Sequence, residues 1–284
     1  MAVAGVAVVT DSTSSLPAER AARAGIAVIP LQVVIGGRSR PETEIAPGIV
    51  AAALREGRSV STSRPSAEAF RAVYDALARA GYEAVVSVHL SGRVSGTVET
   101  AELASRSAVV PVTVVDSRTL GMATGFAALA AADAARSDLP AADIGELARA
   151  RAQSSTTFFC LDSLEHLHRG GRMAAGEGSS PLAAKSLLTV VEGEIRPYER
   201  VRTAAGAVDR LEELGVAVAA QAPPGTPVDV AVHHLDNAEA ARELAGRMRA
   251  GLEAGGEVIV AELGAVLGGH VGPRTIGLVI SPRS

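Results

Sequence analysis

The chain has 284 residues, of which 48% are hydrophobic and 20% charged, and its formal net charge is −4. This composition excludes a disordered protein, and the acidic balance with only 2% aromatic residues argues against nucleic-acid binding. No apolar run reaches the roughly 18 residues of a membrane span, and the single cysteine, Cys160, has no partner for an internal disulfide. We therefore expect a cytoplasmic protein.

In the first half of the chain, short β-branched runs alternate with alanine-rich amphipathic stretches. This alternation is typical of βα units around a largely parallel sheet. In chain order we expect a strand at Val3–Val9, a short helix from Pro17, a strand at Ala27–Ile35, a helix at Ala46–Arg55, an extended segment at Ser59–Thr62, a helix at Ala67–Ala80, a strand at Ala84–Val88, a helix from about Ser95, a strand at Val112–Val115 and helices over most of Gly121–Gln153.

The second half has the pattern of an α+β domain, with strands that are not regularly followed by helices. We place the boundary near residue 152, with an N-terminal α/β domain at 1–152 and a C-terminal α+β domain at 153–284. The expected elements are a strand at Thr156–Leu161, a hairpin of Leu187–Val191 and Glu194–Tyr198, a helix at Ala204–Ala220, a strand at Val228–His233, a helix at Ala238–Ala254, and strands at Val258–Glu262 and Ile276–Ile280.

Common enzyme signatures are missing from the sequence. It has no G-x-x-x-x-G-K-[ST] phosphate loop and no H-E-x-x-H zinc motif. The segment Gly92–Gly96 differs by one residue from the G-x-S-x-G turn of serine hydrolases. We expect no cofactor and no metal ion.

Polar residues follow the predicted first strand and precede a predicted helix. Val9–Thr13 places a carboxylate and hydroxyls at a strand end, where ligand sites of α/β proteins form, although a helix N-cap explains the same residues. Ser61–Ser66 places several hydroxyls before a proline, and these can meet an oxygen-rich ligand or simply form a turn and a helix cap.

Two further polar segments carry a serine and a histidine. In Leu90–Thr97, Ser95 sits where a helix begins, and the free N–H groups of a helix N-terminus favour an anion there. A serine that only caps the N-terminus of this helix explains Ser95 equally well. In Gly268–Pro273, the lone His270 stands among glycines between two apolar strands, a setting that core packing explains poorly.

These segments together resemble the DegV family, which includes fatty-acid-binding subunits of bacterial fatty acid kinase. The resemblance covers essentially the whole chain and rests on motifs in the same order and with similar spacing. They are Val9-Thr10-Asp11-Ser12-Thr13, Thr62-Ser63-Arg64-Pro65-Ser66, Val94-Ser95-Gly96-Thr97, Val115-Asp116-Ser117, Leu164–Arg172, Arg200-Val201-Arg202-Thr203 and Gly268–Pro273.

The resemblance implies an α/β domain and an α+β domain with a long-chain fatty acid between them. It implies that Thr62 and Ser95 bind the carboxylate, with His270 near the head group. The other expected ligand-binding residues are their neighbours Ser61, Ser63, Gly96 and Thr97. The implied partner is the catalytic subunit of an ATP-dependent fatty acid kinase serving phospholipid metabolism, with transient membrane contact possible.

Two arginines are expected to face the kinase. Arg202 matches a family arginine that works with the kinase, and Arg172 lies in a matching Gly-Gly-Arg turn. The chain departs from the family pattern at Arg64, where glutamine is usual, and at Arg274, where small residues are common. Each of these two arginines either adds charge near the carboxylate or points to solvent.

An enzyme is the main alternative to a carrier. A serine hydrolase would use Ser95 as nucleophile, His270 as base, and Asp11 or Asp116 to orient the histidine. The resemblance implies no hydrolase activity. A regulator that binds DNA or RNA is a third alternative, disfavoured by the acidic composition.

Overall fold

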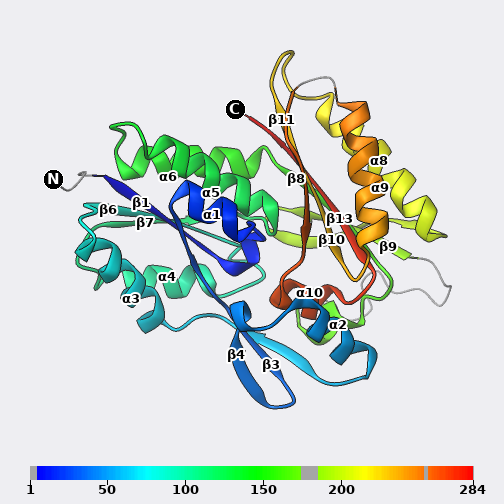
Figure 1. The fold of residues 1–284 in the computed structure, drawn as a ribbon, viewed down its shortest axis with the longest axis horizontal. Coiled ribbons are helices and arrows are strands. Elements are labelled where there is room, and N and C mark those ends of the chain that lie inside the picture. The colour runs from blue at the N-terminus through cyan, green and yellow to red at the C-terminus, as the bar shows by residue number, and fades with distance from the viewer. Residues whose placement is uncertain (1–4, 174–184, 253–254, 284) are drawn as a thin grey trace.

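The computed structural model describes residues 5–173, 185–252 and 255–283. Its N-terminal part is a four-stranded parallel sheet in the order β2-β1-β6-β7 (Figure 1). The strands are β1 (Val6–Asp11), β2 (Ile26–Ile29), β6 (Ala84–His89) and β7 (Val112–Asp116). Val8, Val86 and Val88 are buried because their β-branched side chains pack between the sheet and the helices that cover it.

Helices cover both faces of the parallel sheet (Figure 1). One face is covered by α1 (Ala18–Ala24), α5 (Met122–Ala134) and α6 (Ala141–Gln153), whose alanines pack closely against the strands. The other face is covered by α3 (Ala67–Arg79) and α4 (Thr97–Ser105), with Phe70 and Tyr74 of α3 fully buried. The result is a three-layer α/β unit.

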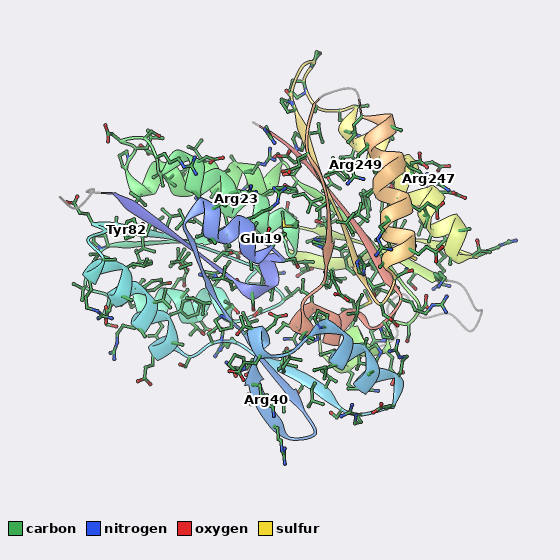
Figure 2. The ribbon with its side chains drawn as sticks, viewed as in Figure 1. Glu19, Arg23, Arg40, Tyr82, Arg247 and Arg249 are labelled. Atoms are coloured by element: carbon green, nitrogen blue, oxygen red, sulfur yellow. The ribbon has the colours of Figure 1, made fainter. Side chains whose placement is uncertain are left out.

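After β2 the chain leaves the parallel sheet and forms a small antiparallel sheet in the order β4-β3-β5. Its strands are β3 (Gln32–Ile35), β4 (Arg38–Pro41) and β5 (Val60–Ser63). A 3-10 turn at Glu42–Glu44 and helix α2 (Pro47–Arg55) connect β4 to β5. Figure 2 shows Arg40 projecting from the exposed β3–β4 hairpin. The single strand predicted at Ala27–Ile35 is therefore wrong, because Pro30 cannot donate a ladder hydrogen bond and the chain changes sheets there.

The C-terminal part is a six-stranded mixed sheet in the order β10-β9-β8-β13-β11-β12. Only β11 and β12 pair in parallel. The strands are β8 (Thr156–Leu161), β9 (Lys185–Val191), β10 (Glu194–Val201), β11 (Val228–Leu235), β12 (Val258–Glu262) and β13 (Thr275–Pro282). Helices α8 (Ala204–Ala219) and α9 (Ala238–Gly251) pack on one face of this sheet, and α5 contacts the other.

Two short helices lie near the strand ends of the mixed sheet, α7 (Glu165–Arg169) and α10 (Ala265–Val271). The glycine-rich segment around His270, for which no helix was predicted, is thus helical in its first part. Helix α10 packs on the small antiparallel sheet, where Val266 joins a cluster with Val33 and Val50. Segments about 200 residues apart in the sequence therefore meet at this point.

The predicted fold class is confirmed as an α/β protein with a parallel sheet and a second, mixed sheet. The division of the chain near residue 152 stays a prediction. The helix expected from Ser95 begins at Thr97, with Gly96 as its N-cap, and β4 and α7 were not predicted. Val3 and Ala4 of the first predicted strand, and Glu253 and Ala254 of the predicted helix, lie outside the described residues.

Candidate functional site

A cavity with mainly apolar walls lies between the parallel sheet and the mixed sheet. Its lining comes from β5, the loop after β6, β8, β13 and α10, with Leu90, Phe159, Leu167 and Val266 among the apolar side chains. The cavity encloses about 1020 Å³ of empty space when its open mouth is counted. This size suits a small organic ligand, and the lining suits an apolar one.

Hydroxyls, a histidine and two arginines gather in one part of this lining. Thr62, Ser63, Ser95, Gly96 and His270 all line the cavity, as do Arg64 and Arg172. The structure thus brings the segments around residues 62, 95 and 270 together, and their role in binding a ligand stays a prediction. Because the remaining lining is largely apolar, the cavity has one polar region and a long apolar wall.

His270 and Thr62 form the centre of the polar region. The hydroxyl of Thr62 lies 2.7 Å from Nε2 of His270. Glycines make this approach possible, because a Cβ at Gly269 would lie 3.0 Å from Cγ1 of Val60 and one at Gly170 would lie 2.7 Å from Nδ1 of His270. A cluster of glycines around His270 thus reflects close packing of α10 against β5 and the end of α7.

The His270 ring is neutral at pH 7. Burial, together with the neighbouring positive Arg172 and the His166 ring, lowers its pKa to about 4. A neutral ring can donate from one nitrogen and accept at the other, so His270 can hold the Thr62 hydroxyl in one orientation without adding a charge of its own.

Ser95 lies just before the first turn of α4. Its hydroxyl is 2.8 Å from Oγ1 of Thr97, and its backbone N–H donates to the carbonyl of Ser91 at 3.2 Å. The N-cap position is Gly96, but the Ser95 hydroxyl accepts from the N–H of Thr97 at 3.4 Å, so Ser95 contributes to capping α4 from one residue further out. The side chain of Ser95 is part-buried and lines the cavity, where it can donate to an anion.

Arg172 lines the cavity and is partly buried, in contrast to the fully exposed Arg202. Its Nε donates to the carbonyl of Val94 at 3.2 Å, and its guanidinium also contacts the carbonyl of Gly170. Burial lowers the pKa of Arg172 from its usual value. The side chain thus joins the Ser95 loop to the α7 turn and places a cation beside His270.

The two arginines that depart from the family pattern differ in position. Arg64 lines the cavity, donates to the carboxylate of Glu99 at 2.9 Å and passes close over Gly96, where a Cβ would require its guanidinium to move. Arg274 is exposed, pairs with Asp162 at 3.2 Å and is not among the lining residues. Arg64 alone of the two adds charge to the polar region.

Two predicted ligand residues and Arg202 lie outside the cavity lining. Ser61 is exposed on β5, because neighbouring residues of a strand point to opposite faces. Thr97 is fully buried behind Ser95. Arg202 is exposed between β10 and α8.

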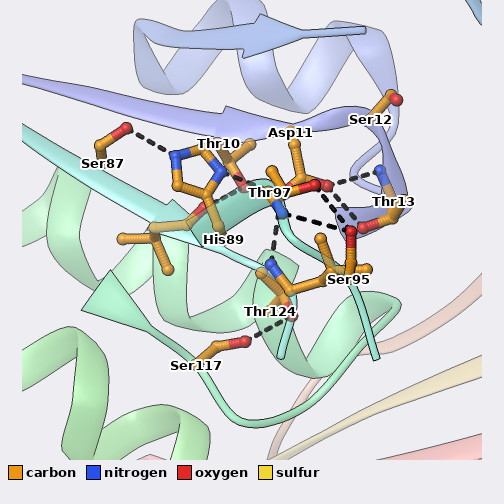
Figure 3. Close-up of polar contacts among 12 residues, drawn as sticks. Thr10, Asp11, Ser12, Thr13, Ser87, His89, Ser95, Thr97, Ser117 and Thr124 are labelled. Atoms are coloured by element: carbon orange, nitrogen blue, oxygen red, sulfur yellow. Dashed lines mark hydrogen bonds and ion pairs between the residues drawn. The ribbon is translucent and has the colours of Figure 1, made fainter. Parts of the chain in front are cut away.

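A buried hydrogen-bond network supports the loop that carries Ser95 (Figure 3). Oδ2 of Asp11 accepts from the N–H of Leu90 at 3.1 Å and lies 2.9 Å from Nδ1 of His89. The network continues from His89 to Ser87 at 2.7 Å and from Ser87 to Tyr74 at 2.9 Å. Asp11 is therefore a structural anchor of this loop.

The geometry does not assemble the hydrolase alternative. The hydroxyl bonded to His270 belongs to Thr62, whereas Ser95 pairs with Thr97. Asp11 pairs with His89, and Asp116 accepts from the N–H groups of Gly92 and Arg118. Nothing in the described structure connects Ser95, His270 and a carboxylate in series, and a ring with a pKa near 4 is a weak base at neutral pH.

Two other properties concern metal ions and membranes. Within residues 5–173, 185–252 and 255–283, no group of three or more His, Cys, Asp or Glu side chains is placed to hold a metal ion. None of the helices in these ranges is both long enough and apolar enough to span a bilayer.

The fold and cavity define an α/β protein with a parallel sheet, a second, mixed sheet and a largely apolar cavity that has one polar region. A family model described as "Uncharacterised protein, DegV family" matches residues 5–283. A DegV domain-containing protein of Streptomyces coelicolor is 44% identical over 281 residues, which cover 98% of this chain and 99% of that protein. The chain belongs to the DegV family.

Solved structures of the family have the same fold. A structure described as "Fatty Acid Binding of a DegV family Protein from Thermus thermophilus" matches with a TM-score of 0.89 at 30% identity, covering 98% of this chain and 99% of that one. A structure of Bacillus subtilis DegV, described as a fatty acid binding protein, matches with a TM-score of 0.88 at 30% identity over 99% of this chain and 100% of that one.

Proposed function

We propose that this protein binds a long-chain fatty acid in the cavity and presents the carboxylate to a separate ATP-dependent fatty acid kinase. The observation that carries the proposal is a largely apolar cavity whose hydroxyls, histidine and arginines gather in one region. That arrangement matches a ligand with one charged end and a long apolar tail. The binding of fatty acids by relatives of the same fold supports the choice of ligand.

The tail accounts for most of the affinity. Burial contributes about 0.8 kcal/mol per methylene, so a chain of roughly fifteen methylenes gains on the order of 12 kcal/mol before the costs of association. Each hydrogen bond to the carboxylate contributes about 1.5–3 kcal/mol in gross terms. The tail therefore retains the ligand, and the polar region orients it.

The head-group residues act by binding and orientation. Thr62 and Ser95 donate hydrogen bonds to the carboxylate, and the Nε2–H of neutral His270 donates to the Thr62 hydroxyl and holds it in that orientation. Arg172 keeps the carboxylate ionised, as a nearby cation does for any acid. In the proposed reaction a carboxylate oxygen attacks the γ-phosphoryl group of ATP held by the kinase, ADP leaves, and an acyl phosphate for phospholipid synthesis forms.

Arg202 is expected to act on the kinase and not on the lipid, because it is exposed and lies outside the cavity lining. Changing Arg202→Ala should lower acyl-phosphate formation by about tenfold, the usual effect of one exposed interface contact of about 1.4 kcal/mol, and leave fatty-acid affinity unchanged. The assay combines the protein, a bacterial fatty acid kinase catalytic subunit, ATP and oleate.

The matched control is Arg71→Ala, which removes an exposed arginine from α3. It should change neither turnover nor affinity. A loss of oleate binding in Arg202→Ala, or the same loss of turnover in both variants, would contradict a kinase-facing role.

A further inference from the structure

A glycine lies in the middle of the mixed sheet on the cavity wall. Gly277 belongs to β13, which is flanked by β8 and β11, and it is buried and lines the cavity. Glycine inside a buried strand costs stability, because it has no side chain to pack, and such a position often marks the close approach of a ligand. Gly277 therefore needs an explanation beyond the fold.

The neighbours of Gly277 form two walls of a groove. Its paired residues are Phe159 on β8 and His233 on β11, and all three line the cavity. The Cβ atoms of Phe159 and His233 both lie within 3.5 Å of the place that a Cβ at residue 277 would take, so they are at most about 7 Å apart with only a glycine between them. The missing side chain leaves a hollow in the cavity wall between these two residues.

The His233 wall is rigid and offers no free hydrogen bond. Its Nε2 accepts from the N–H of Met122 at 3.0 Å, and its Nδ1 lies 3.1 Å from the carbonyl of Ala261. Both nitrogens are therefore occupied, and burial lowers the pKa of the ring to about 4. A groove with Phe159 on one side and a fully bonded neutral ring on the other suits an apolar chain.

The groove leads away from the head-group region. Strand β13 begins at Thr275, four residues after the end of α10, the helix that carries His270. A strand advances about 3.3 Å per residue, so Gly277 lies about 7 Å along β13 from Thr275. It lines the same cavity as Thr62, Ser95 and His270 but is not one of the polar side chains, so a tail whose carboxylate is held at Thr62 and Ser95 can reach it.

We propose that the acyl tail crosses the sheet over Gly277, between Phe159 and His233, and that Gly277 sets the chain length the cavity accepts. The inference rests on the proposed fatty-acid binding. A Cβ at residue 277 would lie 3.4 Å from Cβ of His233 and 3.5 Å from Cβ of Phe159, which is ordinary contact. An alanine therefore fits in ordinary contact with its neighbours, and the further atoms of a larger side chain take the space of the tail.

The experiment measures dissociation constants of decanoate, laurate, myristate, palmitate and stearate for the wild type, Gly277→Ala and Gly277→Val. In the wild type, affinity should rise with each added pair of methylenes until the cavity is full. In Gly277→Val the rise should stop at a shorter acid, with stearate bound at least about tenfold more weakly, the effect of excluding about two methylenes. Gly277→Ala should lie between.

The control Gly246→Ala adds a methyl group to an exposed glycine of α9 that has open space around it. It should reproduce the wild-type series. A Gly277→Val series that stops at the same acid as the wild type overturns the role of Gly277. A wild type that binds none of the acids overturns the proposed function instead, so the two failures are distinguishable.

Discussion

Replacing Thr62 by valine and Ser95 by alanine in one chain is expected to lower acyl-phosphate formation about a hundredfold or more, with retention of a long fatty acid reduced by less than about tenfold. Ser63 and Arg64 beside the carboxylate are exposed to solvent, so the carboxylate can exchange its lost hydrogen bonds for water and the net loss of binding is small. Without the two hydroxyls its oxygens are no longer held in one orientation for attack on ATP.

Turnover with the kinase catalytic subunit and equilibrium binding of oleate are measured on the same preparation. Ser61→Ala serves as the control, because Ser61 neighbours Thr62 on β5 but is exposed and outside the cavity lining. It should behave as the wild type in both assays. Equal losses of turnover and binding in the double variant would refute the division of labour between head group and tail.

Asp11→Ala is expected to lower the free energy of unfolding by about 3–5 kcal/mol. The Asp11 carboxylate is fully buried and accepts from the N–H groups of Thr13 and Leu90 and from the Thr13 hydroxyl, and it lies 2.9 Å from Nδ1 of His89. Removing it leaves these buried groups without an acceptor, and each such group costs about 1–3 kcal/mol.

The free energies come from urea unfolding at pH 7. Asp116→Ala is the comparison, since Asp116 also follows a parallel strand and also accepts two backbone N–H groups but is only partly buried. Its loss should be clearly smaller. Asp11→Asn, which keeps one acceptor oxygen, should fall between the wild type and Asp11→Ala. An Asp11→Ala loss below about 1 kcal/mol would show that the network does not anchor the Ser95 loop.

The fold class followed from local patterns. Apolar β-branched runs such as Ala84–Val88 and amphipathic runs such as Ala67–Ala80 each report their own secondary structure. The break at Pro30 was hidden by β-branched residues on both sides of it. The helix at Ala265–Val271 was hidden by two glycines, which are poor helix formers and are placed there because α10 approaches β5 closely.

The candidate site was predicted as a set of segments but not as a set of contacts. The hydrogen bond between Thr62 and His270 joins residues 208 apart, and the pair of Asp11 and His89 joins residues 78 apart. Residue spacing carries no information on contacts at such separations. His89 ends the apolar strand β6, and although one partner, Ser87, is close in the sequence, nothing there indicates the other partner, Asp11. Gly277 is equally inconspicuous between Ile276 and Leu278.

Native mass spectrometry of the protein as purified, followed by solvent extraction and analysis of the bound material, tests the central proposal most directly. We expect one fatty acid per chain, whose length also reports how far the cavity extends past Gly277. A protein that carries no lipid and takes up neither added palmitate nor added oleate would contradict fatty-acid binding, and with it the presentation of a carboxylate to a kinase.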